Sequence, residues 1–368
     1  MRIFLCGDVM LGRGVDQALP WPCGPELHER YMSSALDYMR LAELKNGSIS
    51  PPLNLAAVWG AALDEFERRR PDVRLINLET RITRSNNYLP KGINYRMSPE
   101  NARCLAAAHI DCCVLANNHV LDWGRRGLID TVATLKGMGI QSAGAARNTR
   151  QAVRPAIVDC KGRGRLVVYS LASITSGVPP DWEATADNAG VNLLPDLSKA
   201  TAERLGAHIA QECRPDDIVI TSIHWGANWG YEIPSEQCEF ARALVDCAPV
   251  SIVHGHSSHH AKAIEVYRGR LILYGCGDFL NDYEGIGGRE EFRGDLVVMY
   301  FADVDGLSKS LLALEMVPLN IRQLQLHVAS AADAEWLVRR LDRECRHFGA
   351  QVRQRNGSMH LLVGAIRN

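Results

Sequence analysis

Short apolar runs that end in polar residues recur along this sequence. The run at 112–116 leads directly into Asn117, Asn118 and His119, with Asp122 three residues further on. Parallel strands that are buried on both faces have continuous apolar sequences, and open α/β sheets bind ligands at the carboxyl ends of their strands. The pattern therefore predicts a buried strand that delivers polar side chains to one edge of a sheet.

Four further apolar runs have the same form. The run at 4–6 is followed by Asp8, and the run at 73–76 is followed by Asn77 and Glu79. The remaining two runs, at 218–223 and 250–253, lead into His224, His254, His256, His259 and His260. Five runs that end in acidic, amide or imidazole side chains predict one shared cleft at the carboxyl ends of the strands.

Segments with helical periodicity separate these strands. We expect helices at 26–46, 56–70, 99–109, 127–138, 197–212, 235–247 and 332–348. Further strands are expected at 140–144, 156–160, 166–171, 263–266, 271–274, 295–302 and 311–317. This alternation is typical of a layered α/β fold, and no low-complexity linker divides the chain.

We therefore interpret residues 1–368 as a single domain. Residues 16–56 are bracketed by prolines and predict an insertion that forms part of a substrate lid. Residues 303–368 form a C-terminal strand and helix extension. The loop at 175–192 carries Pro179 and Pro180, and we expect its Trp182 to be exposed.

Composition narrows the range of functions. The 368 residues are 46% hydrophobic and 23% charged, and the formal net charge is −1, so nucleic acid is not an expected partner. The eleven cysteines lack the spacing of a metal ribbon or a disulfide framework, which indicates reduced thiols. The sequence shows neither a signal-peptide pattern nor a membrane span, so we predict a cytoplasmic protein. It does not indicate an oligomeric state.

The polar residues at the strand ends suit a metal centre. Carboxylate, amide and imidazole groups are donors that Mn²⁺, Fe²⁺ or Zn²⁺ accept. A single histidine after a strand is more often a hydrogen-bonded structural residue than a ligand. Four histidines within residues 254–260, separated by glycine and serine, have no explanation in packing and point to a function.

The motifs resemble, in order, those of the CapA family of poly-γ-glutamate capsule synthesis proteins, which have a calcineurin-like metallophosphoesterase fold. They are Gly-Asp-Val-Met-Leu at 7–11, Asn-Leu-Glu at 77–79, the segment 117–124, His-Trp-Gly at 224–226 and Gly-His-Ser-Ser-His at 255–259. The resemblance implies a β-sandwich flanked by helices, with the site at the strand carboxyl ends. It places Asp8, Glu79, Asn118, His224, His256 and His259 at ligand positions, and His119 at that of the acid that protonates a leaving group.

Three departures from the metallophosphoesterase pattern weaken the case for a complete two-metal centre. Met10 stands where such enzymes carry a ligand histidine, and Glu79 replaces the usual bridging aspartate. The closing Gly-His-x-His motif is one residue longer here. We therefore expect one divalent metal, or none.

The expected cytoplasmic location and the incomplete metal motif favour one of three functions. Capsule-synthesis members of the family carry a membrane anchor, whereas some soluble relatives resemble peptide epimerases. We favour epimerisation at an amino-acid Cα of a peptide over metal-dependent hydrolysis of a phosphoester or amide. A non-catalytic role in polyglutamate capsule synthesis is the third alternative. The expected partner is a peptide or a polyglutamate-like substrate.

Epimerisation needs an acid and a base on opposite faces of the substrate. Asp8, His119 and His256 are candidates, and so is Cys276, which lies between two glycines where its thiol would be accessible. The alternative for Cys276 is a small residue in a tight turn. Asp278 is a further catalytic candidate, or else a turn former or an orienter of a histidine.

Other polar and aromatic residues have supporting roles in this interpretation. Asp122 either orients His119 or caps the following helix. Asn117 and His254 support the ligands. The residues proposed to bind substrate are Trp225, Trp229, Tyr231 and Arg96. The aromatic residues are equally compatible with a core, and Arg96 with a solvated surface charge.

Overall fold

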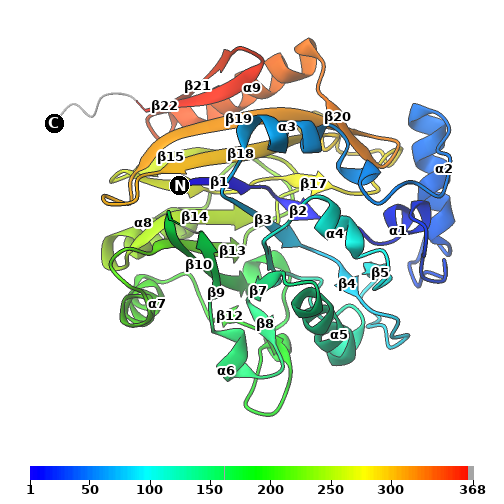
Figure 1. Cartoon of the computed structure of the whole chain (residues 1–368), viewed down its shortest axis with the longest axis horizontal. Helices are drawn as coiled ribbons and strands as arrows, with labels where there is room; N and C mark the ends of the chain where they lie inside the picture. The colour runs from blue at the N-terminus through cyan, green and yellow to red at the C-terminus, as the bar shows by residue number, and fades with distance from the viewer. Residues whose placement is uncertain (161, 364–368) are drawn as a thin grey trace.

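Two β-sheets pack face to face in the computed structural model, which describes residues 1–160 and 162–363 (Figure 1). The first sheet runs in the order β17 (Asp278–Leu280), β2 (Asp8–Val9), β3 (Val73–Leu78), β1 (Arg2–Leu5), β18 (Leu296–Val304), β19 (Leu311–Arg322), β22 (Ser358–Val363) and β21 (Ala350–Arg355). β3 also pairs with β6 (Cys112–Val114), which pairs in turn with β7 (Gln141–Ala143), and β20 (Gln325–Val328) pairs with β19.

The second sheet has a parallel centre. Its order is β12 (Leu193–Leu194), β10 (Gly164–Ser173), β13 (Ile218–His224), β14 (Val250–His256), β16 (Arg270–Leu273) and β15 (Ile264–Tyr267). β9 (Ala156–Cys160) pairs with β10. Two short ribbons lie outside both sheets, formed by β4 (Arg81–Ile82) with β5 (Arg96–Met97) and by β8 (Ala145–Ala146) with β11 (Gly190–Val191).

The alternating directions of the side chains along β1 explain why the first sheet packs against a layer on each of its faces. Ile3 and Leu5 belong to the apolar cluster between the two sheets, whereas Phe4 and Cys6 belong to the cluster under the helices. Successive side chains of a strand point to opposite faces, so an unbroken apolar run fills two cores at once. Each fully buried aliphatic or aromatic side chain contributes roughly 1.5–3 kcal/mol to this packing.

Helices cover both outer faces of the sandwich (Figure 1). α3 (Ala61–Arg69), α4 (Arg103–Ala107) and α5 (Gly124–Gly137) pack on the first sheet through Phe66, Leu105 and Leu128. α7 (Lys199–Glu212) and α8 (Ser235–Cys247) cover the second sheet through Ile209 and Phe240. The predicted layered sandwich flanked by helices is confirmed.

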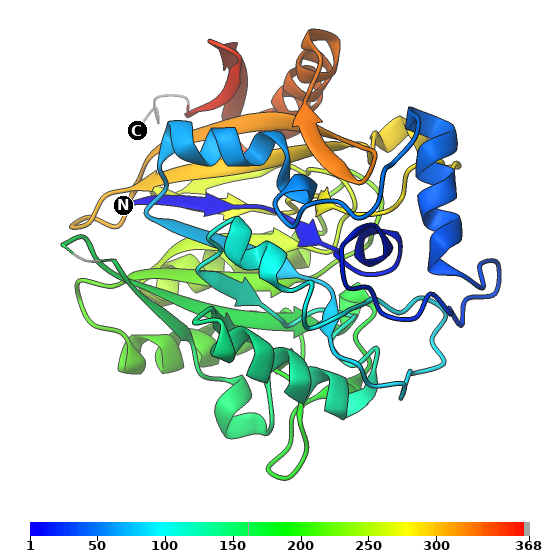
Figure 2. The same cartoon turned by 45° about the vertical axis from the view of Figure 1, so that its right-hand side comes forward.

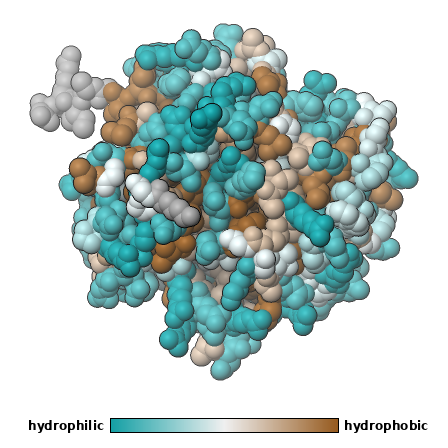
Figure 3. Space-filling view, viewed as in Figure 1, coloured by the Kyte–Doolittle hydropathy of each residue, from teal (hydrophilic) through white to brown (hydrophobic). Residues whose placement is uncertain are grey.

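The remaining helices are short or lie at the sides of the sandwich. They are α1 (Gly14–Ala18), α2 (Ala35–Asn46), α6 (Thr149–Ala152) and α9 (Ala331–Arg346), with 3₁₀ turns at Ala57–Trp59, Ile174–Ser176, Pro180–Trp182 and Glu290–Phe292. Hydrophilic residues and small hydrophobic patches alternate on the face seen in Figure 3. None of the helices in the described ranges is long and apolar enough to cross a bilayer.

Three predicted helices are clearly shorter than the sequence pattern suggested, and one of them, expected at 99–109, spans only Arg103–Ala107. The helix expected at 26–46 begins only at Ala35, because the side chain of Ser34 accepts the Leu36 amide and caps it there. The helix expected at 56–70 breaks at Gly60, whose φ is 41°. A Cβ at this glycine would lie 2.1 Å from the carbonyl oxygen of Leu326, so close backbone contact imposes the break.

The proline-bracketed segment 16–56 lies on the side of the molecule toward which β1, β2 and β17 point (Figures 1 and 2). Arg13, just before this segment, binds Glu29 within it and Asp282 outside it. A lid function for this segment remains a prediction. The C-terminal extension contributes Leu337 and Leu341 of α9 to the apolar cluster between the sheets, and its residues 364–368 lie outside the described residues.

Candidate metal centre

Asp8 lies at the centre of the polar cluster. It begins β2, pairs in register with Asn77 on one side and Asp278 on the other, and is fully buried. Asn77 Nδ2 donates to Asp8 Oδ1 at 2.7 Å, whereas Asp8 Oδ2 has no hydrogen-bond partner among the described residues. A buried carboxylate oxygen without a partner is costly, so this atom is suited to a ligand.

One set of metal-donor atoms joins Asp8 to His224 and His256, which end β13 and β14 as direct neighbours. The three donor atoms lie within 4.8 Å of one another. The Nδ1 atoms of the two histidines are 2.7 Å apart, and Asn118 Oδ1 lies 3.2 Å from His224 Nε2. Burial lowers the pKa of both imidazoles well below the usual value, which keeps them neutral, as metal ligands must be.

A second set joins Asp8 to His259 and Asp278, with donor atoms again within 4.8 Å of one another. His259 Nδ1 lies 2.9 Å from Asp278 Oδ1, and Asn281 Nδ2 donates to Asp278 Oδ2 at 2.8 Å. Burial opposes protonation of His259, but the Asp278 carboxylate outweighs it and raises the pKa of the imidazole. The two sets share the Asp8 carboxylate, as a pair of bridged ions requires.

The donor chemistry fits divalent metal ions. One set is rich in nitrogen, the other is rich in oxygen, and Asp8 belongs to both. Mn²⁺, Fe²⁺ and Zn²⁺ all accept such mixtures of imidazole and carboxylate. In this respect the residues present can hold the ions that the sequence resemblance implied.

Asp278 occupies a ligand position that the sequence interpretation did not give it. Met10, two residues after Asp8, belongs to neither donor set and accepts a hydrogen bond on its sulfur from Tyr283 at 3.4 Å. The expectation of one metal or none rested on the missing histidine at position 10, on Glu79 and on the longer closing motif. In the sequence, Asp278 follows a turn that contains Gly275 and Gly277, after a strand. Only its pairing with Asp8 in the structure shows that it lies at a potential ligand position.

Glu79 and Asn77 lie beside the two donor sets. Asn77 Nδ2 lies 3.1 Å from Glu79 Oε2, and Asn117 Nδ2 donates to Asn77 Oδ1 at 3.0 Å. Burial and the adjacent Asp8 raise the pKa of Glu79 well above its usual value. Burial, followed by the charge of Asp278, raises the pKa of Asp8 to about 7. This concentration of acidic groups favours the presence of cations.

His119 lies at the edge of the cluster in a fixed orientation. Its Nδ1 is 2.7 Å from Asp122 Oδ2, and its Nε2 is 3.7 Å from Glu79 Oε1. Lys91 Nζ lies 2.7 Å from Asp122 Oδ1 and 2.5 Å from the Asn118 carbonyl oxygen. Burial lowers the pKa of His119 to about 4. Burial favours protonation of Asp122, but His119 and Lys91 outweigh it and lower the pKa of this carboxyl.

The structure disagrees with one expectation, for Trp182, and excludes one of the two alternatives given for Cys276 and for Asp122. The Cys276 thiol is not accessible: the residue is 1% exposed, and burial raises its pKa well above the usual value, because the turn at 275–277 packs beneath Gly7. Trp182 is 6% exposed and packs in the cluster under the helices. Asp122 does not cap the next helix, since Trp123 holds the capping position and the Asp122 carboxylate accepts the Tyr95 amide.

The other predicted residues have contacts that are largely structural. His254 joins the two sheets, because its Nε2 lies 2.8 Å from the carbonyl oxygen of Cys6. Trp225 is buried and donates to the Tyr274 carbonyl, so it belongs to the core and does not floor a pocket. Trp229 and Tyr231 are half-buried, and both pack against Phe292.

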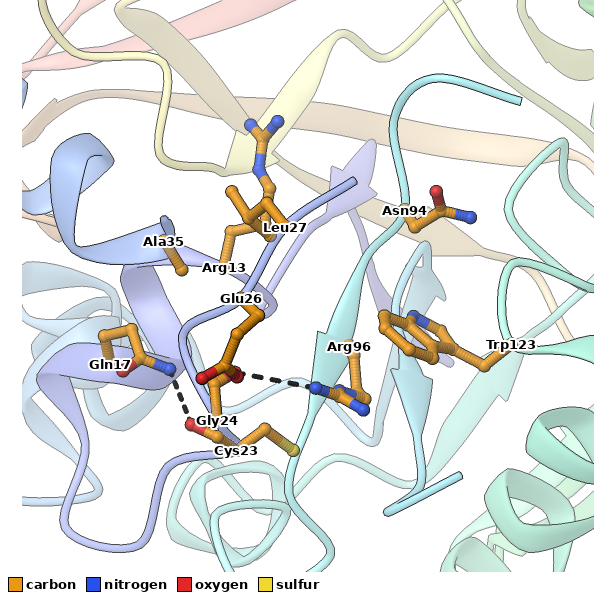
Figure 4. Close-up of a pocket in the computed structure, with 10 residues that line it drawn as sticks. All are labelled: Arg13, Gln17, Cys23, Gly24, Glu26, Leu27, Ala35, Asn94, Arg96 and Trp123. Atoms are coloured by element: carbon orange, nitrogen blue, oxygen red, sulfur yellow. Dashed lines mark hydrogen bonds between the residues drawn. The ribbon is translucent and has the colours of Figure 1, made fainter. Parts of the chain in front are cut away.

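Arg96 lies beside a small internal cavity (Figure 4). Its guanidinium stacks over the Trp123 ring at 3.9 Å and donates to the carbonyl oxygens of Ser85 and Gly24. The cavity measures about 10 Å³, which is room for one water molecule. Arg96 therefore faces a space too small for a substrate.

Comparison with known proteins gives consistent results. Residues 2–283 match the model of the family described as bacterial capsule synthesis protein PGA_cap. The chain is 47% identical to a probable polyglutamine synthesis accessory protein of Mycobacterium tuberculosis, over 99% of this chain and 96% of that protein. It is 24% identical to the capsule biosynthesis protein CapA of Bacillus anthracis, over 94% and 73% of the two chains. A crystal structure described as a novel phosphatase of Mycoplasma pneumoniae is 14% identical, with a TM-score of 0.47 over 87% and 93% of the two chains.

Proposed function

The chain belongs to the PGA_cap family of bacterial capsule synthesis proteins, and we propose that it is a metal-dependent hydrolase that acts on an amide or phosphoester bond during polyglutamate synthesis. The names of its relatives in Mycobacterium and Bacillus support the pathway. The observation that carries the proposed activity is the Asp8 carboxylate, which is shared by two sets of donor atoms and has one oxygen without a partner.

Each ligand has a defined place in this proposal. Asp8, His224 and His256, with Asn118 beside them, would hold one ion, and Asp8, His259 and Asp278 would hold the other. Bound at these positions, divalent ions supply Lewis-acid polarisation of the scissile group and a water of lowered pKa. Glu79 lies next to Asp8 through the shared amide of Asn77, and cations bound nearby would favour the ionised form of its carboxyl group.

His119 is the group that moves a proton. Hydrogen bonding of Nδ1 to Asp122 assigns the ring proton to that nitrogen and leaves Nε2 free to face the cluster. Nε2 then exchanges a proton with the attacking water or with the leaving group, depending on the stage of the reaction. Lys91 keeps Asp122 ionised and holds the segment that contains Asn118 and His119 by binding the Asn118 carbonyl.

Two of the arguments for epimerisation are weakened. The expectation of a depleted metal site rested on Met10, on Glu79 and on the longer closing motif, and Asp278 supplies a donor that Met10 does not. The thiol base rested on an accessible Cys276, which is buried with a raised pKa. The remaining polar groups of the cluster are arranged around Asp8 as metal donors and not as an acid and a base on opposite faces of a substrate.

Metal analysis and hydrolysis assays test this proposal. We expect the purified protein to retain Mn, Fe or Zn, and to cleave either an aryl phosphate or a γ-linked glutamate oligomer in a manner that a chelator abolishes. His256→Ala should abolish both metal retention and turnover, whereas His327→Ala on β20, outside the cluster, should leave both unchanged. Solvent deuterium at a peptide Cα without any hydrolysis would refute the proposal and restore epimerisation.

A further inference from the structure

A surface hollow of about 370 Å³ lies next to the candidate metal centre. Its lining residues are Asn87, Leu89, Leu121, Gly124, Arg125, Arg126, Asp181 and Trp182. Four of them, Leu121, Gly124, Arg125 and Arg126, lie in the segment just after His119 in the sequence.

Lys91 connects the hollow with the centre. Its Nζ lies 5.4 Å from the centroid of the Trp182 ring, and the same atom contacts the carbonyl oxygen of Asn118 at 2.5 Å and Asp122 Oδ1 at 2.7 Å. The Lys91 side chain therefore lies between Trp182, which lines the hollow, and Asn118, a candidate metal ligand.

The lining of the hollow includes both apolar and charged residues. Leu89, Leu121 and the buried Trp182 offer surface that favours methylene groups. Arg125 and Arg126 offer guanidinium groups that bind carboxylates, while Asn87 can donate to or accept from an amide.

Arg125 differs from the other cations of this region. Its guanidinium donates to the carbonyl oxygens of Ala189 and Asp181, which are neutral, and it forms no ion pair with the carboxylates of residues 1–160 and 162–363. Arg126 is paired with Asp130 at 2.8 Å, and Lys91 is paired with Asp122. A half-buried cation whose acceptors are neutral is a favourable site for an anionic ligand.

We propose that this hollow is a subsite that binds one carboxylate-bearing unit of an anionic chain, with the scissile bond placed beyond Lys91. The inference rests on the proposed function for its direction along the chain, but not for the binding itself. The unit's carboxylate pairs with Arg125, and its methylene groups cover Leu89, Leu121 and Trp182. Asp181 on the rim repels a second nearby anion, so the subsite favours a chain of glutamate-like units over a dense polyanion such as polyphosphate.

Binding of a labelled oligomer tests the subsite without catalysis. The probe is a fluorescent γ-linked glutamate pentamer, titrated with the full-length protein in the presence of a chelator, so that nothing is cleaved. We expect Arg125→Gln to raise the Kd at least about tenfold and to reduce the dependence of Kd on salt. The control is Arg355→Gln, an exposed arginine on β21, which should leave the Kd unchanged.

A second variant guards against a folding defect at Arg125, which also holds a loop. The Arg126 side chain is 75% exposed, so Arg126→Glu reverses a rim charge without disturbing the core, and we expect it to raise the Kd several-fold. An unchanged Kd in both variants would overturn the subsite, and so would equal affinity for a neutral glutamine pentamer. Failure of the proposed function has a separate signature, which is wild-type protein that binds the pentamer but hydrolyses nothing.

Discussion

Asp8 and Asp278, 270 positions apart in the sequence, are paired residues of the neighbouring strands β2 and β17, and both belong with His259 to one set of potential metal donors. This pairing changes how the apolar Met10 is interpreted. A donor that the local motif lacks is provided from the other side of Asp8, so the motif alone underestimates the capacity of the site for metal.

The first prediction concerns this replacement. Asp278→Ala should remove one of the two donor sets, so that the bound metal falls by about half, because three donors from the protein are the usual minimum for a catalytic site. Met10→Leu is the matched control, since it conserves volume and removes no donor. Elemental analysis after dialysis measures both. The assignment is wrong if the Met10 variant loses metal while the Asp278 variant retains it.

A second prediction separates proton transfer from metal binding. His119→Ala should lower kcat by about 10²–10⁴-fold, as expected for the loss of a general acid or base, while the metal content stays constant. Asp122→Asn should lower kcat by about 10–100-fold, because it only orients the imidazole. His224→Ala, by contrast, should lose metal. Loss of metal in the His119 variant would show that its imidazole is a ligand.

A third prediction concerns the thiols. Cys276 is buried and its pKa is raised, so it should resist a thiol reagent in the native protein, whereas the exposed Cys247 should react. Cys276→Ser should leave kcat within about threefold of wild type, since nothing in the proposed hydrolysis uses the thiol. Rapid native labelling at position 276, mapped by mass spectrometry, would contradict the buried position on which this argument depends.

Sequence reasoning located much of the site because a general rule applied. Buried parallel strands end at one edge of a sheet, so the polar residues after 112–116, 218–223 and 250–253 converge. That rule brought Asn118, His224 and His256 together from segments far apart in the chain. The rule needed no knowledge of side-chain contacts. The alternation of strands and helices predicted a layered α/β fold, whereas the sandwich of two sheets was implied by the resemblance to the CapA family.

The failures have a different physical origin. Cys276 lies between two glycines, a pattern typical of exposed turns, but Gly7 and Gly277 bring two backbones so close that a Cβ at Gly7 would lie 1.6 Å from the Gly277 carbonyl oxygen. Trp182 lies in a proline-containing loop, yet the loop folds back and buries the indole. Both outcomes depend on contacts between distant segments, and local composition carries no information about these.

The last prediction concerns the anchoring of β13, the strand that ends in His224. Asp217, immediately before this strand, accepts two hydrogen bonds from Arg165, at 2.8 and 2.7 Å, and one from the Arg214 amide at 2.8 Å. Burial favours protonation of Asp217, but the bonds from Arg165 and the Arg214 amide outweigh it and hold its pKa below the usual value. A depressed carboxyl pKa stabilises the fold above the pKa of the unfolded chain, near 4, and this contribution is lost as the pH falls through the lower folded value.

Asp217→Asn should therefore lower the free energy of unfolding by about 1.5–3 kcal/mol at pH 7, and by progressively less as the pH falls below about 4. Urea denaturation at several pH values measures the difference, with the exposed Asp216→Asn as the control. A difference that stays constant down to pH 3 would mean that the effect of the substitution does not come from the charge of Asp217.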